Sequence, residues 1–300
     1  MYHLFMIDYH LHGNFCGHAE GELEEYVLEA LGKGFVEIGF SDHLPKVVNP
    51  DPYHAMLEER LPEYVALVGH LQRKYAGKIT IRLGIEADFF PGFEDRTRSL
   101  LASMPFDYVL GSVHFLGDWH FTSKAHRDRY ETEDPGVAFP RHFELLGSMI
   151  ESGLFDVLAH PDALRKERFV PPLPPEREYA GIAALLAARG MAIEVNTAGL
   201  RRGAGSIYPD PALLAACHGA GVPVTLGSDA HAPVDVGRDF TLAFQLLERT
   251  GVTEIATYEG RRMTRRPIGE FRQVAGSGRF YDMLSGGEAL WRKQHEPNRP

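Results

Sequence analysis

The sequence has few cysteines, no surplus of positive charge and no long hydrophobic run. Cys16 and Cys217 are the only cysteines among 300 residues, too few for a disulfide framework and typical of a reducing compartment. Asp and Glu outnumber Lys and Arg by 41 to 31. This balance disfavours sequence-independent binding to nucleic acid, because such binding needs clustered cations. The apolar stretch at residues 4–7 is too short for a signal-peptide core, and no other run is long enough to cross a bilayer. These features predict a cytoplasmic protein without nucleic-acid or membrane partners.

Apolar, β-branched runs recur along the chain and alternate with segments of helical spacing. The runs cover residues 4–7, 36–40, 79–85, 108–113, 155–159, 191–195 and 222–226. Helical spacing is clear, for example, in residues 61–71 and in the alanine-rich stretch that ends at Gly190. This alternation predicts a parallel sheet covered by helices, and seven or eight repeats favour a closed or distorted βα barrel over an open sheet.

One large domain is expected to account for most of the chain, because 300 residues with 44% hydrophobic content can build a barrel that folds as one unit. We assign residues 1–270 to this barrel and residues 271–300, which are rich in Gly and polar residues, to a loosely held C-terminal tail. Residues 117–133 and 171–175 break the alternation and are predicted to form loops over one end of the barrel.

Histidine is unusually frequent, with 15 in the chain. The first apolar run continues into His10 and His12, and His18 follows shortly after. Side chains at alternate positions of a strand point to one face, and imidazole is a common ligand of zinc-like ions. The His-x-His pair alone is weak evidence, because two exposed histidines would produce the same pattern.

The same arrangement, an apolar run followed by a potential metal ligand, recurs along the chain. Six of the seven runs end in a residue that can bind a metal ion. After the first run, these residues are His43, Glu86, His114, His160, and the pair Asp229 and His231. In a parallel barrel the C-terminal ends of the strands meet at one mouth, so these side chains are expected to converge. Taken singly, Glu86 could be a rim charge, His160 a turn residue and Asp229 a helix N-cap. Their joint placement favours a metal site.

The remaining histidines and Cys16 lack this placement. Those interpreted as structural or solvated are His54, His70, His142 and His218. His120 and His126 lie in the long loop after His114 and are interpreted as rim residues. Cys16 has no adjacent basic residue that would activate it, and it is interpreted as a small packing residue.

Nine candidate ligands are more than one tetrahedral zinc ion can use. They are His10, His12, His18, His43, Glu86, His114, His160, Asp229 and His231. We expect two or three divalent ions, with a carboxylate such as Glu86 bridging a pair. Imidazole and carboxylate suit zinc, iron and manganese alike. Three such ions beside two anionic side chains would leave the site strongly cationic, which favours an anionic substrate such as a phosphate dianion.

These residues, in this order, resemble the motifs of the polymerase and histidinol phosphatase (PHP) superfamily across residues 8–231. The segments at residues 16–19, 84–89, 107–114 and 196–201 resemble its histidinol-phosphate phosphatase branch, which makes L-histidinol in histidine biosynthesis. The resemblance implies an α/β fold: a distorted (βα)7 TIM-like barrel with a trinuclear metal site at the C-terminal ends of the strands.

The resemblance also implies how the ligands divide among three ions. One ion would be held by His10, His12, Glu86 and Asp229, a second by His18, His43 and His231, and a third by Glu86, His114 and His160. The implied activity is hydrolysis of L-histidinol phosphate, a small phosphorylated amino alcohol. A hydroxide bound to the ions would attack phosphorus, with no catalytic side chain beyond it.

Polar side chains near the barrel mouth are expected to complete phosphate binding. The predicted substrate-binding residues are Lys166, Arg201, Arg202 and Ser112. Lys166 and Arg201 are preferred, whereas Arg165 and Arg202 could equally be solvated rim charges. Aspartates that flank the proposed ligands could orient the imidazoles or recognise the substrate amine. These aspartates are Asp42, Asp88 and Asp162.

Three other functions are compatible with the sequence. Another PHP-type phosphoesterase, acting on nucleotides or other small phosphates, would use the same ligands. An amidohydrolase-type C–N hydrolase also opens its barrel with His-x-His, but such enzymes usually add a bridging lysine after a middle strand, and no predicted strand here ends in lysine. A non-enzymatic metal-storage or scaffold role is the third. The oligomeric state is left open.

Overall fold

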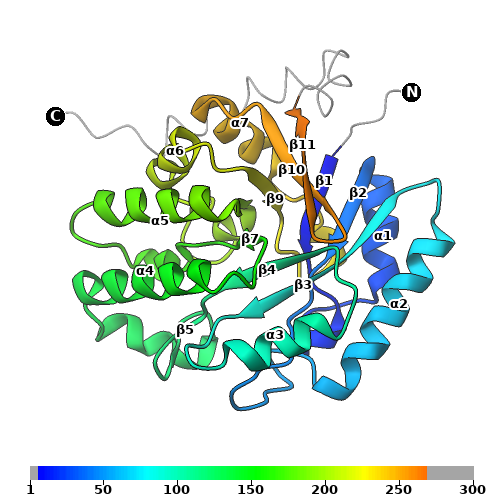
Figure 1. Ribbon diagram of the computed structural model, residues 1–300, viewed down its shortest axis with the longest axis horizontal. Helices are drawn as coiled ribbons and strands as arrows, with labels where there is room; N and C mark the ends of the chain where they lie inside the picture. Colours follow the sequence, from blue (N-terminus) through cyan, green and yellow to red (C-terminus); the bar gives the residue numbers. More distant parts are fainter. Residues whose placement is uncertain (1–5, 269–300) are drawn as a thin grey trace.

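The computed structural model describes residues 6–268, and its centre is a sheet of seven strands (Figure 1). The strands are β1 (Met6–Leu11), β2 (Phe35–Phe40), β3 (Thr80–Asp88), β4 (Tyr108–Ser112), β7 (Val157–Leu158), β8 (Ala192–Asn196) and β9 (Val224–Gly227). They follow one another in the sheet in chain order, and every neighbouring pair is parallel. The seven predicted apolar runs overlap these seven strands.

The sheet curls so that its last strand returns to its first. Leu11 and Ala230 form a parallel bridge just beyond the end of β9. The amide of His12 donates to the carbonyl of Ala230 at 2.9 Å, and the amide of Ala230 donates to the carbonyl of His10 at 3.1 Å. These bonds bring β1 and β9 together at the C-terminal end of the sheet. The predicted distorted (βα)7 barrel is therefore confirmed.

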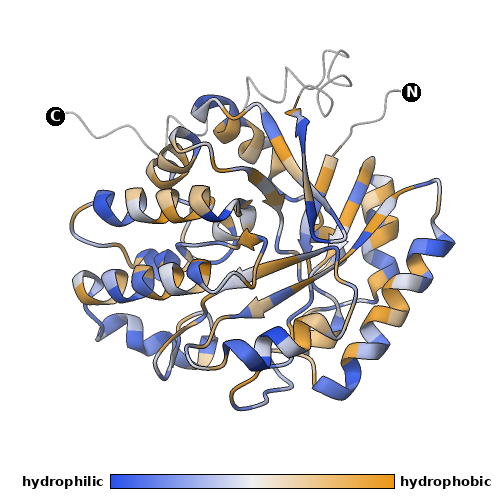
Figure 2. Cartoon of the chain, viewed as in Figure 1, coloured by the Kyte–Doolittle hydropathy of each residue, from blue (hydrophilic) through white to orange (hydrophobic). Residues whose placement is uncertain are grey.

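Helices follow the strands and cover the outside of the barrel (Figure 1). They are α1 (Leu23–Gly32), α2 (Leu61–Lys74), α3 (Glu94–Ala102), α4 (Pro135–Glu151), α5 (Glu176–Arg189), α6 (Pro211–Gly219) and α7 (Phe240–Thr250). Short 3-10 helices are η1 (Asn14–Cys16), η2 (Glu58–Arg60), η3 (Lys124–Glu131), η4 (Ala163–Arg168), η5 (Thr197–Leu200) and η6 (Pro233–Asp235). In Figure 2 the central strands are mainly hydrophobic, whereas the helices carry both hydrophobic and hydrophilic residues. That pattern suits a layer with one buried face.

Local sequence signals explain where several helices begin and end. Asp134 accepts a hydrogen bond from the amide of Gly136 and caps α4, and Asp210 caps α6 through the amide of Ala212. α5 ends at Gly190, whose φ of 66° is left-handed and therefore favours glycine. The capped starts of α4 and α6 follow the segments at the mouth, after β4 and β8, whereas Gly190 leads into β8 at the opposite end of the barrel.

Two β-hairpins were not predicted. β5 (Phe115–Leu116) and β6 (Trp119–His120) pair at the start of the segment expected to be a loop. β10 (Glu254–Glu259) and β11 (Arg262–Pro267) pair after the last helix. The second strand of that hairpin is mostly exposed and rich in arginine, so it lacks the apolar run that marks a buried strand.

The β10–β11 hairpin packs against the barrel through the backbone of β10. Thr225 of β9 donates its hydroxyl to the carbonyl of Ala256 at 3.0 Å, and the amide of Tyr258 donates to the hydroxyl of Tyr9 at 3.2 Å. Tyr9 stacks on Tyr108 with ring centroids 4.9 Å apart. The domain boundary at residue 270 and the predicted tail, residues 271–300, lie outside the described residues. Within residues 6–268, no helix combines the length and apolarity that crossing a membrane requires.

Candidate metal centre

Glu86, near the C-terminal end of β3, is the centre of a cluster of buried imidazoles. Its carboxylate is 1% exposed and lies among side chains from β1 and from the loops after β1, β2, β4 and β7. The imidazole nitrogens nearest to Oε2 are His43 Nδ1 at 3.1 Å, His10 Nε2 at 3.2 Å and His12 Nε2 at 3.4 Å. Those nearest to Oε1 are His160 Nε2 at 3.0 Å and His114 Nε2 at 3.5 Å. One carboxylate therefore faces five imidazoles from distant parts of the chain.

Asp229 and His231, after β9, extend the cluster on the other side of His12. Asp229 Oδ1 lies 3.6 Å from His12 Nε2 and 3.2 Å from His231 Nδ1. His231 Nε2 lies 2.9 Å from His18 Nε2. Asp229 has a φ of 51° and His160 a φ of 23°, which are uncommon for residues with a side chain and cluster at functional sites. The structure thus brings all nine predicted ligands together at the barrel mouth.

The chemistry of this cluster fits divalent ions. Both ring nitrogens of His12 are buried and have no hydrogen-bond partner, although an unpaired buried polar atom costs about 1–3 kcal/mol. A metal ion would satisfy such a nitrogen. Several groups in the described residues place their ligand atoms within 4.8 Å of one another. They include His10 with His12 and Glu86, His12 with His43 and His231, and His10 with His160 and Asp229.

Burial keeps several of these imidazoles neutral, which is the form that binds a metal ion. It lowers the pKa of His12 well below the ordinary value, and it lowers the pKa of His18 to about 4. His10 behaves differently. Burial alone would lower its pKa, but the adjacent carboxylates of Glu194 and Glu86 outweigh burial and raise it well above the ordinary value.

Glu194 of β8 is a site residue that the sequence analysis missed. Its Oε1 lies 2.6 Å from His10 Nδ1, and its Oε2 accepts a hydrogen bond from the amide of His160 at 2.9 Å and from the amide group of Asn196 at 3.0 Å. A carboxylate on the far nitrogen of a ligating histidine fixes the ring's orientation and tautomer. The available signal was an acidic residue in the middle of a buried apolar strand. β8 also corresponds to the one predicted run that does not end in a potential metal ligand.

We expect Glu194→Gln to weaken metal binding about 10- to 100-fold, because it removes the charge that orients His10. Activity should fall at limiting metal and return when more metal is added. Titrating the metal-depleted variant and wild type with zinc, with phosphate release as the readout, measures this difference. A circular dichroism spectrum equal to that of metal-free wild type would exclude a folding defect, and identical titration curves would contradict the positioning role.

The three flanking aspartates play different parts. Asp88 Oδ1 lies 2.7 Å from His114 Nδ1, so it orients that imidazole. Asp42 accepts backbone hydrogen bonds from Gly13 and His43 and lies 3.8 Å from His12 Nδ1, too far for a hydrogen bond. The remaining one, Asp162, faces Arg165 and the amide of Asp210 instead of an imidazole. Imidazole orientation is thus observed for one of the three.

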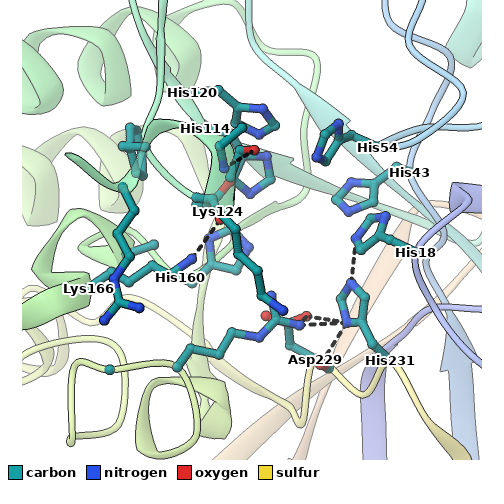
Figure 3. Close-up of a pocket in the computed structure, with 18 of the residues that line it drawn as sticks. His18, His43, His54, His114, His120, Lys124, His160, Lys166, Asp229 and His231 are labelled. Carbon is teal, nitrogen blue, oxygen red and sulfur yellow. Dashed lines mark hydrogen bonds and ion pairs between the residues drawn. The ribbon is translucent and has the colours of Figure 1, made fainter. Parts of the chain in front are cut away.

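A cavity of about 1000 Å³ opens beside the histidine cluster (Figure 3). Lys166, Arg201 and Arg202 all line it, and Lys166 donates to the carbonyl of Thr122 at 2.6 Å. Ser112 is fully buried and does not belong to the lining. In Figure 3, Lys166 lies on the same side as His160, opposite His18 and His43. The cavity therefore contains cations as well as the imidazoles of the cluster.

The two predicted arginines differ in how they are held. Arg201 is mostly buried, donates to the carbonyl of Ser228 at 2.6 Å and lies 3.7 Å from Asp235. Arg202 is more exposed, with its NH2 nitrogen 3.5 Å from Asp229 Oδ1 and 2.8 Å from His231 Nδ1. Arg201 is tied to the protein, whereas Arg202 points at the cluster.

The other histidines and Cys16 can now be compared with the roles that were expected for them from the sequence. His54, interpreted as structural or solvated, lines the cavity, and so does His120, whose ring is 4.8 Å from that of His54. His142 is buried on α4, with Nε2 2.7 Å from the carbonyl oxygen of Pro161. Cys16 is buried and donates to the carbonyl of Gly13 at 3.3 Å. Burial raises the pKa of its thiol, which agrees with a packing role.

Comparison with known proteins identifies the family. Residues 8–198 match the PHP domain. The chain is 38% identical to "Probable histidinol-phosphatase" of Deinococcus radiodurans over 86% of this chain and 98% of the relative. It is 29% identical to the histidinol-phosphatase of Bacillus subtilis over 77% of this chain and 95% of the relative.

A solved structure has the same fold. It is the histidinol phosphate phosphatase of Lactococcus lactis in complex with zinc, L-histidinol and phosphate, with a TM-score of 0.73 and 25% identity over 86% of this chain and 98% of that one. The match to the PHP domain, the curated relatives and the shared barrel agree with one another. The chain belongs to the PHP family and, within it, to the histidinol-phosphatases.

Proposed function

We propose that this protein hydrolyses L-histidinol phosphate to L-histidinol and phosphate. The observation that carries the proposal is the cluster of nine potential ligands around Glu86, seven of which line a cavity that also carries cations. The Lactococcus lactis relative was solved with zinc, L-histidinol and phosphate. A small phosphorylated amino alcohol suits this cavity better than a polynucleotide, because the chain has ten more acidic than basic residues. The two free cysteines are in keeping with a cytoplasmic location.

We infer that two or three divalent ions occupy the cluster and that its nine residues are their ligands. The presence of zinc in the Lactococcus lactis structure favours zinc, and iron or manganese would suit the same donor atoms. When bound, such ions would polarise the phosphate oxygens and lower the pKa of a water molecule toward neutrality. The ligand groups observed in the structure support the implied set of His10, His12 and Glu86 most directly.

The protein's own residues are proposed to bind and orient the phosphate. Lys166 and Arg202 lie on the cavity wall with charged groups that can reach phosphate oxygens. Arg201 already binds a backbone carbonyl and two aspartates, so we assign it to holding the segment that leads into Asp229. No side chain is required to form a covalent bond to phosphorus.

Turnover of a substrate panel tests the proposed function, with phosphate release measured for the phosphate esters and ring opening measured for the amide. The panel contains L-histidinol phosphate, a nucleoside monophosphate, a simple aryl phosphate and a cyclic amide, each offered to zinc-loaded protein. L-histidinol phosphate should have the highest kcat/KM. A preference for the nucleotide would favour another phosphoesterase, and turnover of the cyclic amide alone would favour a C–N hydrolase. Bound metal without any turnover would favour a storage role. None of the seven barrel strands contains lysine, which argues against the C–N hydrolase.

Lys166 should make activity depend on pH in the alkaline range. Burial and the nearby Arg202 lower its pKa to about 8, so it loses its charge as the pH rises through that value. A neutral amine attracts phosphate less, and kcat/KM should fall about 10-fold or more above pH 8. Lys166→Arg stays charged and should lack this decline, while Lys166→Met should be weak at every pH. An unchanged alkaline decline in Lys166→Arg would contradict the assignment.

A further inference from the structure

One carboxylate on the cavity wall has no part in the metal cluster. The described residues place four carboxylates in the lining: Glu86, Asp88, Glu167 and Asp229. Three of them face imidazoles of the cluster at the distances given above. Glu167, in η4, instead accepts a hydrogen bond from Arg127 at 2.6 Å. It is therefore the cavity carboxylate best placed to serve a ligand.

The backbone holds Glu167 in a special conformation beside a proposed phosphate-binding residue. Glu167 and Arg168 have φ values of 58° and 59°, and consecutive left-handed residues with side chains are uncommon in proteins. Glu167 directly follows Lys166 in the chain, and both residues line the cavity. The cavity wall therefore carries a carboxylate and a cation from neighbouring residues. Strained conformations of this kind persist mainly where a site depends on them.

The opposite side of Glu167 is shaped by Gly203, the residue after Arg202. Gly203 has a φ of 86°, and a Cβ atom added there would lie 3.2 Å from Glu167 Oε1. Because glycine has no Cβ atom, the Glu167 carboxylate can lie close to residue 203, which directly follows Arg202 in the chain. Lys166, Glu167 and Arg202 all line this cavity, so its wall has a pattern of two proposed phosphate-binding cations and one carboxylate outside the metal cluster.

This pattern matches a phosphate ester that carries an ammonium group a few bonds away. Resting on the proposed function, we propose that Glu167 binds the ammonium group of the substrate and makes the enzyme prefer amino-alcohol phosphates to phosphates without an amine. The Arg127 side chain is 69% exposed and that of Glu167 is 22% exposed. An ion pair with so exposed a partner is weak and can yield to a substrate cation. Lys166 and Arg202 then bind the phosphate end.

The experiment compares L-histidinol phosphate with the same ester lacking its amino group. Wild type should prefer the amino substrate, and Glu167→Gln should lose about 10- to 100-fold in kcat/KM on it, as expected for one charged hydrogen bond, with a change of less than about twofold on the other ester. Arg127→Ala is the matched control, because it removes the ion pair and keeps the carboxylate. It should retain the preference of wild type.

Each outcome separates this inference from the proposed function. Equal losses on both esters in Glu167→Gln, or an undiminished preference for the amine, would overturn the role of Glu167 while leaving the phosphatase assignment intact. A wild-type enzyme that hydrolyses both esters equally well would also overturn it. Failure of wild type to hydrolyse either ester would overturn the proposed function, and this inference with it.

Discussion

Glu86→Ala is expected to abolish phosphatase turnover, with a loss of at least about 1000-fold in kcat/KM. Glu86 is the only carboxylate that faces imidazoles on both of its oxygens in the described structure, three at Oε2 and two at Oε1. Removing it takes away the proposed bridge between ions and leaves five imidazoles around an uncharged side chain. A loss of about 4 kcal/mol in transition-state stabilisation corresponds to that factor.

The measurement pairs kinetics on L-histidinol phosphate with elemental analysis of the purified variant. Bound metal should decrease by at least one ion per chain, because a bridging ligand serves two ions. Glu37→Gln is a suitable control, since Glu37 is also buried but contacts Tyr9 and Arg82 in place of the histidines. That control should lose stability and keep its metal. Full activity with unchanged metal in Glu86→Ala would refute the assignment of the cluster.

Removal of metal is expected to abolish activity and to destabilise the fold. The ring nitrogens of His12 are buried without a hydrogen-bond partner from the protein, so leaving them without an ion is unfavourable for the folded state. Binding to the folded state alone stabilises it by about 4 kcal/mol when the free metal is 1000 times Kd. For a chain of 300 residues, whose unfolding entropy is about 2.1 cal/mol/K per residue, that corresponds to a decrease of about 6 °C in Tm after chelation.

Dialysis against a chelator followed by stepwise return of zinc, iron or manganese tests this expectation. Activity and Tm should recover together and saturate at two to three ions per chain, and the metal that restores the highest kcat/KM identifies the preferred cofactor. Asp95→Asn, at an exposed carboxylate of α3 that is not among the residues lining the cavity, provides a matched control whose response to the chelator should equal that of wild type. A chelated protein that retains both turnover and Tm would exclude a metal-dependent mechanism.

Much of the fold could be predicted because hydrophobic patterning is a local property. A run such as residues 108–113 must be buried on both faces, and helical spacing in residues 61–71 requires a helix. The β10–β11 hairpin escaped prediction because its stability comes from pairing and from contacts such as that of Tyr258 with Tyr9. A strand as polar as Arg262–Pro267 carries no such signal.

The candidate ligands could also be found in the sequence, since parallel strands place their C-terminal ends at one mouth. The residues that orient the ligands or face the cavity could not be identified in this way. Glu194 lies inside a strand and could have been read as any buried acid, and its function depends on the approach of His10 and His160. The same holds for Arg201 and Arg202, adjacent in sequence, of which one is tied to Ser228 and the other faces the cluster.

The barrel, the family and the nine residues that meet at its mouth could be identified without the structure, because burial patterns and strand ends are local properties of the sequence. The contacts in the folded protein were needed to find which carboxylates orient imidazoles, which cations face the cavity and which cavity carboxylate has no imidazole partner. Those roles depend on distances of a few ångströms between residues far apart in the chain. Side-chain direction and pairing set such distances, and both arise only after the elements have packed.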